Sequence, residues 1–65
     1  MKWFDVEDIA ESLEELFPEE DLLRIRFTDL KKKVIALDGF HDNVDNCNEK
    51  VLEAIQASWI ELRNE

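Results

Sequence analysis

The segment from Asp38 to Lys50, D-G-F-H-D-N-V-D-N-C-N-E-K, is crowded with side chains that can bind metals or act as catalysts. Its thirteen residues include three aspartates, three asparagines, a histidine, a cysteine and a glutamate. Three kinds of segment have such a composition: a metal-binding loop, a catalytic loop, and a solvated connection between two helices. The spacing of the residues distinguishes these alternatives.

A calcium loop of the EF-hand type is excluded. Such a loop needs oxygen ligands at positions 1, 3 and 5, glycine at position 6 and glutamate at position 12. If Asp38 is position 1, position 3 is Phe40; if Asp42 is position 1, position 3 is Val44 and position 6 is Cys47. A four-ligand zinc site is also excluded, because the chain has one cysteine and one histidine.

A catalytic pair of Cys47 and His41 is disfavoured. The two residues lie in one acidic segment, and neighbouring carboxylates raise the pKa of a thiol instead of lowering it. We expect His41 to be a surface histidine and Cys47 to be a small, partly buried residue. The interpretation that remains is a solvated acidic connection, at most one edge of a surface that attracts cations.

The rest of the chain predicts the helices that this segment connects. Apolar residues at helical spacing indicate a first helix over D-V-E-D-I-A-E-S-L-E-E-L-F-P, capped by Asp5 and ended near Phe17 by the following proline. Its other face is expected to be solvated carboxylate: Glu7, Asp8, Glu11, Glu14 and Glu15.

Residues 23–27 alternate between apolar and basic side chains, which indicates a short extended segment without a partner strand. Thr28 is expected to cap a second helix that stops at Gly39, and Asn48 to cap a third, E-K-V-L-E-A-I-Q-A-S-W-I-E-L-R-N-E. The predicted fold is therefore a single all-α domain over residues 1–65, with three helices and one short extended segment.

The net charge of −9 restricts the partners of the domain. Residues 1–21 and 38–65 are strongly acidic, and residues 22–37 are basic because of Arg24, Arg26, Lys31, Lys32 and Lys33. An acidic field repels nucleic acid and anionic lipid and attracts cations and basic protein surfaces. A nucleic-acid interface on the basic segment is disfavoured for this reason. The absence of a long apolar run predicts no signal peptide and no membrane span, and hence a cytoplasmic protein.

Several motifs resemble the IscX (YfhJ) family of bacterial iron–sulfur cluster assembly. They are K-W-F-D at residues 2–5, the proline after the first helix, R-F-T-D at residues 26–29 and N-E-K-V-L-E-A-I at residues 48–55. The resemblance covers nearly the whole chain. It departs from the family at Asp38–Val44, where the family typically has a denser run of aspartates.

The resemblance implies a modified winged-helix or helix-turn-helix-like domain that is not an enzyme. It implies an adaptor that binds the cysteine desulfurase IscS, competes with components such as frataxin or ferredoxin, and has no tightly bound cofactor. The positions expected to bind the partner are Asp5, Asp8, Glu11, Glu15, Asp21, Asp29, Asp38 and Asp42. Weak binding of ferrous or ferric iron is expected at Asp5, Asp8, Glu11, Glu15, Asp38 and Asp42. The alternative is a dedicated iron donor or carrier for cluster assembly.

Overall fold

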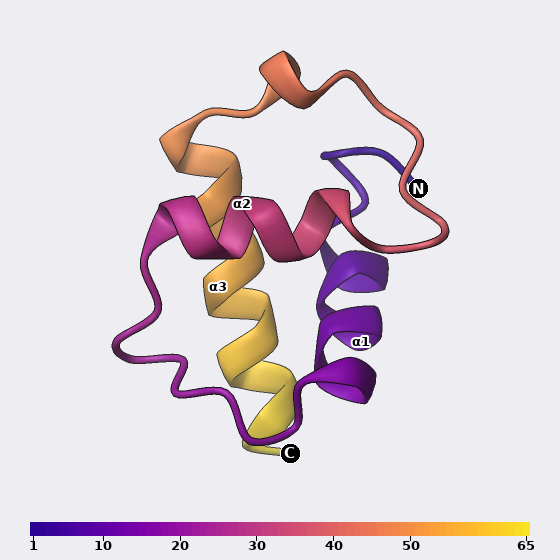
Figure 1. The fold of residues 1–65 in the computed structure, drawn as a ribbon. Helices are drawn as coiled ribbons and strands as arrows, with labels where there is room; N and C mark the ends of the chain where they lie inside the picture. Colours follow the sequence, from indigo (N-terminus) through magenta and orange to yellow (C-terminus); the bar gives the residue numbers. More distant parts are fainter.

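A computed structural model describes residues 1–65 and contains three α-helices, which confirms the all-α prediction. They are α1 (Val6–Leu16), α2 (Phe27–Ile35) and α3 (Glu49–Arg63), with a short 3₁₀ helix, η1 (Val44–Asn46), before α3. No strand is present. Helices α1 and α3 run side by side, and α2 crosses them (Figure 1). None of the helices is long and apolar enough to cross a membrane.

The core consists of twelve buried residues, all of them apolar, and includes both tryptophans. The helical stripes predicted from the sequence supply most of it: Ile9, Ala10, Leu13, Leu30, Val34, Leu37, Val51, Leu52, Ile55 and Trp59. Trp3 and Leu22, which lie outside the helices, complete the set. A domain of this size has little surface to bury, so each of these side chains contributes a large share of its stability.

Two of the predicted helix boundaries are confirmed. The first helix ends at Leu16, two residues before Pro18, which has no backbone N–H to continue the ladder. Asn48 caps α3, since its side-chain oxygen accepts a hydrogen bond from the backbone N–H of Val51 at 2.9 Å. Asp5 occupies the N-cap position of α1, but its carboxylate accepts from the N–H of Lys2, 2.8 Å away, instead of from the helix.

The predicted limits of the second helix are wrong at both ends. It begins at Phe27 with Arg26 at the N-cap, so Thr28 lies inside the first turn. The half-buried Phe27 packs against the core, and including it in the helix places it on the side of Leu30. At the other end, the N–H of Leu37 bonds the carbonyl of Val34 at 3.1 Å, which tightens and closes the last turn. Gly39 does not adopt positive φ, so it does not act as the glycine cap.

The extended segment predicted for residues 23–27 does not form a strand: residues 22–24 lie in turns, residues 25 and 26 have no regular structure, and Phe27 begins α2. Leu22 is buried, whereas its neighbour Leu23 is 84% exposed. The carbonyl of Leu22 accepts a hydrogen bond from the side chain of Gln56 on α3 at 2.7 Å. The alternating pattern was misleading because Phe27 belongs to α2 and Leu23 faces solvent.

The loop from Asp38 to Cys47 holds the N-terminal segment in place. The N–H of His41 donates to the carbonyl of Met1 at 2.8 Å, and the indole N–H of Trp3 donates to the carbonyl of Asn43 at 2.9 Å. The rings of Trp3 and Phe40 meet edge to face, with centroids 4.8 Å apart. The prediction of a solvated connection was therefore incomplete, because this loop also closes the core over a fully buried tryptophan.

Candidate functional site

The outer face of α1 is a surface of unpaired carboxylates. Glu7, Asp8, Glu11 and Glu15 are all exposed, as their helical spacing predicts. The structure contains three salt bridges, and none of them involves these four side chains. Glu7 and Glu11, and Glu11 and Glu15, are four residues apart, so they repel one another without an internal counterion. This face is therefore available to positive charge from outside the molecule.

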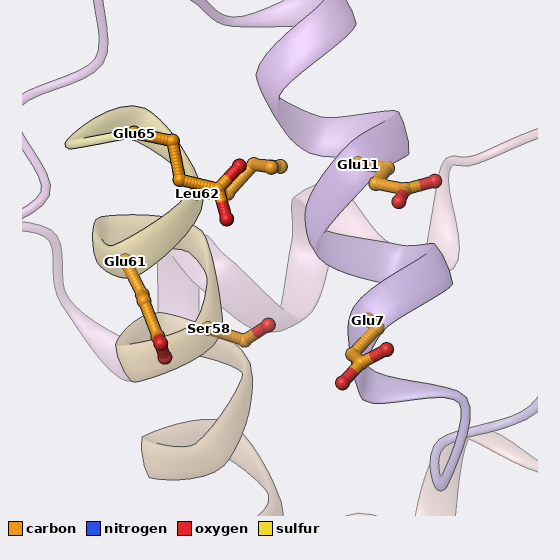
Figure 2. Close-up of a pocket in the computed structure, with 6 residues that line it drawn as sticks. All are labelled: Glu7, Glu11, Ser58, Glu61, Leu62 and Glu65. Carbon is orange, nitrogen blue, oxygen red and sulfur yellow. The ribbon is translucent and has the colours of Figure 1, made fainter.

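A groove between α1 and α3 adds further carboxylates to this surface. It has a volume of about 240 Å³ and is lined by Glu7 and Glu11 from α1 and by Ser58, Glu61, Leu62 and Glu65 from the C-terminal part of the chain. Figure 2 shows these side chains on the two walls, with Glu11 directed away from α3. Five of the six lining residues are polar, so the groove suits a cationic group and not an apolar one.

Glu14 does not belong to this exposed face, although the sequence pattern placed it there. It is half-buried, and its carboxylate accepts hydrogen bonds from the indole N–H of Trp59 at 2.9 Å and from Arg63 at 2.8 Å. Arg63 also donates to the carbonyls of Phe17, at 2.9 Å, and of Glu20. The hydrogen bond from Arg63, followed by that from Trp59, lowers the pKa of Glu14 below its usual value. Glu14 thus joins α3 to the end of α1.

Asp42 is likewise held by internal hydrogen bonds. Its carboxylate accepts from the backbone N–H of Trp3 at 3.1 Å, from that of Asn43 at 2.7 Å and from the side chain of Asn46 at 3.1 Å. These contacts, led by the one from Trp3, lower its pKa. Its oxygens already have partners inside the molecule, unlike those of the α1 face.

The other predicted positions are divided among separate parts of the surface. Asp5 and Asp8 lie together near Phe4 at the start of α1. Glu15 and Asp38 line one hollow between α1 and the turn after α2. Asp21 pairs with Arg24 at 3.7 Å, and Asp29 is exposed in the first turn of α2. The structure therefore brings some of the eight positions together in pairs, but it does not gather them into one cluster.

Comparison with known proteins decides the family. Residues 1–64 match the family model described as iron–sulphur cluster assembly. An uncharacterized protein of Pseudomonas aeruginosa is 48% identical over 64 residues, which cover 98% of this chain and 97% of that protein. The chain belongs to the iron–sulphur cluster assembly family, also known as the IscX family. The resemblance seen in the motifs is thereby confirmed.

No three of the aspartate, glutamate, histidine and cysteine side chains in this IscX-family chain lie close enough to share a metal ion. The carboxylates of the α1–α3 groove stand on separate walls (Figure 2), and those of Asp42 and Glu14 are engaged by donors. Weak iron binding through Asp5, Asp8, Glu11, Glu15, Asp38 and Asp42 stays a prediction.

Cys47 and His41 are placed as the sequence predicted. His41 is exposed, and Cys47 is partly buried. The thiol donates to the carbonyl of Asn48 at 3.7 Å, and burial raises its pKa. A protonated thiol that bonds a backbone carbonyl is a poor nucleophile.

Sequence reasoning missed two residues of the acidic surface, Glu61 and Glu65, and it placed Glu7 on the carboxylate face of α1 without including it among the predicted binding positions. Glu61 and Glu65 are four residues apart, as are Glu7 and Glu11, so each pair indicated a carboxylate edge on its own helix. The pairing of α1 with α3, which makes one groove of the two edges, could not be seen in either helix alone.

Proposed function

We propose that this protein is a non-enzymatic adaptor and regulator of iron–sulphur cluster assembly in the cytoplasm, which docks through its acidic surface on a basic patch of the cysteine desulfurase IscS. The family membership supports the assembly role. The observation that supports this docking surface is that the carboxylates of α1 are exposed and without internal salt bridges.

Electrostatic complementarity explains how such a surface would act. Opposite potentials accelerate encounter, orient the two proteins and lose effect as salt screens them. Docking would cover desulfurase surface that other acidic components, such as frataxin or ferredoxin, also use. The protein would then regulate cluster assembly by occupying that desulfurase surface and excluding the other components. Weak iron binding by the surface carboxylates would reduce the negative charge of the docking face. The fold is also proposed to be related to winged-helix or helix-turn-helix domains, as the family resemblance implies.

Charge reversal in the groove tests the docking surface. The double substitution Glu11→Lys and Glu61→Lys changes one carboxylate on each wall, and neither residue is in a salt bridge. We expect the affinity for IscS to fall more than about tenfold at low salt, with helix content unchanged in circular dichroism. The control, Glu19→Lys with Glu53→Lys, makes the same change of net charge at exposed positions outside the groove. Equal losses in both variants would contradict a localised docking surface.

The second candidate function, a dedicated iron donor, is favoured by the same exposed carboxylates. It predicts saturable binding of ferrous or ferric iron at micromolar concentration in the absence of any partner. Titration against IscS at two salt concentrations, with and without ferrous iron, separates the candidates. If this protein binds IscS only when ferrous iron is present, the result favours the iron donor. If its affinity for IscS depends on salt and not on iron, the result favours the adaptor.

A further inference from the structure

A second hollow, between α1 and the turn after α2, differs from the acidic groove in having an apolar floor. It has a volume of about 350 Å³ and is lined by Met1, Leu16, Ala36 and Leu37, together with Ser12, Glu15, Asp38 and Gly39. Half of its lining residues are apolar, compared with one of six in the acidic groove. Of the two, only this hollow has the surface to bind an apolar side chain.

Leu16 makes this apolar floor accessible. It is the last residue of α1, and 61% of it is exposed. A single exposed leucine is ordinary on a protein surface. This one, however, lies in the same hollow as Leu37, which belongs to the core, and the hollow therefore extends the core to the surface. A partner side chain placed there would remove apolar area of both proteins from water.

The rim of the hollow specifies the charge of its occupant. Glu15 and Asp38 are exposed, and neither is in a salt bridge. Helix α2 ends at Ile35, so the residues that follow and line the hollow, Ala36–Gly39, stand at its C-terminal end. That end of a helix has a partial negative charge from its free carbonyl groups. The N-terminal ammonium of Met1 also lies beside the hollow, where it donates to the carbonyl of Gly39 and offsets part of this negative charge. Two carboxylates and the end of α2 outweigh one ammonium, so the rim favours lysine or arginine beside the apolar group.

We propose that this hollow is an anchor site for a basic segment of the partner protein that presents one apolar side chain flanked by lysine or arginine. This inference rests on the proposed function, and it adds an apolar contact to the electrostatic one. A second copy of the chain fits less well, because each copy has a net charge of −9 and would bring further carboxylates to the rim.

Leu16→Ala tests the anchor, and Leu23→Ala is its matched control. Both leucines are exposed, and neither belongs to the core, so both variants are expected to fold. We expect Leu16→Ala to weaken binding to IscS about tenfold at low and at high salt, since an apolar contact is not screened. Leu23→Ala should bind like the unmodified chain. Equal affinities of the two variants would overturn the proposal.

The double substitution Glu15→Gln and Asp38→Asn tests the rim. It should weaken binding at low salt and have a much smaller effect at high salt; no effect at low salt would overturn the charge argument. If the double variant Glu11→Lys and Glu61→Lys loses binding to IscS while Leu16→Ala retains it, the proposed function is supported and the anchor site is overturned. If the unmodified chain does not bind IscS, both fall. Self-association that Leu16→Ala abolishes, measured by sedimentation, would assign the hollow to a second copy and overturn the proposal.

Discussion

The loop from Asp38 to Cys47 and the outer face of α1 are both rich in carboxylates, yet the structure uses them in opposite ways. In the loop, Asp42 accepts three hydrogen bonds and fixes the backbone of the buried Trp3. On α1, Glu7, Asp8, Glu11 and Glu15 are exposed and in no salt bridge. The loop has the denser cluster of chemically active side chains in the sequence, but the carboxylates available to a partner are those of α1.

This difference shows that the number of acidic residues in a segment does not indicate its function. A carboxylate surrounded by internal donors stabilises the fold and has few lone pairs left for a ligand. A carboxylate without such donors slightly destabilises its helix and remains available to a partner. The following predictions test the comparison by changing the loop, α1, or the internally bonded carboxylates of both.

The largest effect is expected when the side chain that the loop holds is removed. Trp3→Ala should lower the free energy of unfolding by about 3–5 kcal/mol, because it leaves a cavity and deprives Asn43 of an indole donor. The measurement is urea unfolding followed by circular dichroism. The control is the neighbouring Phe4→Ala, which should change little because Phe4 is 82% exposed. A small effect of Trp3→Ala would show that the loop is only a solvated connection.

Acidification should weaken the contacts of Asp42 and Glu14. Both have pKa values lowered in the folded state, so the charged forms favour folding. Their contribution is complete above the unfolded pKa of about 4 and is lost as the pH falls through the lower folded pKa. Unfolding measured from pH 6 to pH 2.5 should show this loss in the unmodified chain. A variant with Asp42→Asn and Glu14→Gln should depend less on pH; an unchanged dependence would contradict the role of these carboxylates.

The cap at the end of the loop should have a smaller effect. Asn48→Ala removes the hydrogen bond to the N–H of Val51 and should cost about 1 kcal/mol in unfolding free energy. Asn64→Ala is the control, since the side chain of Asn64 makes no hydrogen bond and is exposed. If the two alanine variants were equally stable, Asn48 would not contribute as a cap.

The smallest effect is expected on α1, and it has the opposite sign. Glu11→Gln removes the like-charge repulsion with Glu7 and Glu15 and should raise stability by roughly 0.5 kcal/mol at low salt. The gain should disappear at high salt. Glu19→Gln, outside the helices, should give no gain. A loss of stability in Glu11→Gln would mean that this carboxylate has an internal role, as Glu14 does.

Local pattern was enough to predict α1, α3 and most of the core. The 3.6-residue period of apolar side chains identified the buried stripes, Pro18 indicated the end of α1, and Asn48 indicated the start of α3. These signals can be seen in the sequence because they act between residues close in the chain. The same reasoning predicted the buried stripe of α2 but failed for the limits of that helix and for residues 23–27. There the packing of Phe27 and Leu22 against the core overrides the tendency of Thr28 to cap a helix and of Gly39 to end one.

The sequence by itself determined the acidic charge of this protein, its helical class and its family. Only the tertiary structure decided which carboxylates are free: it turned Glu14 toward Arg63 on α3, bound Asp42 to Trp3 and placed Glu11 and Glu61 on opposite walls of one groove. The physical reason is that hydrogen bonds and grooves form between residues some forty or fifty positions apart. The charge of a side chain is a local property, whereas its partners are set by packing.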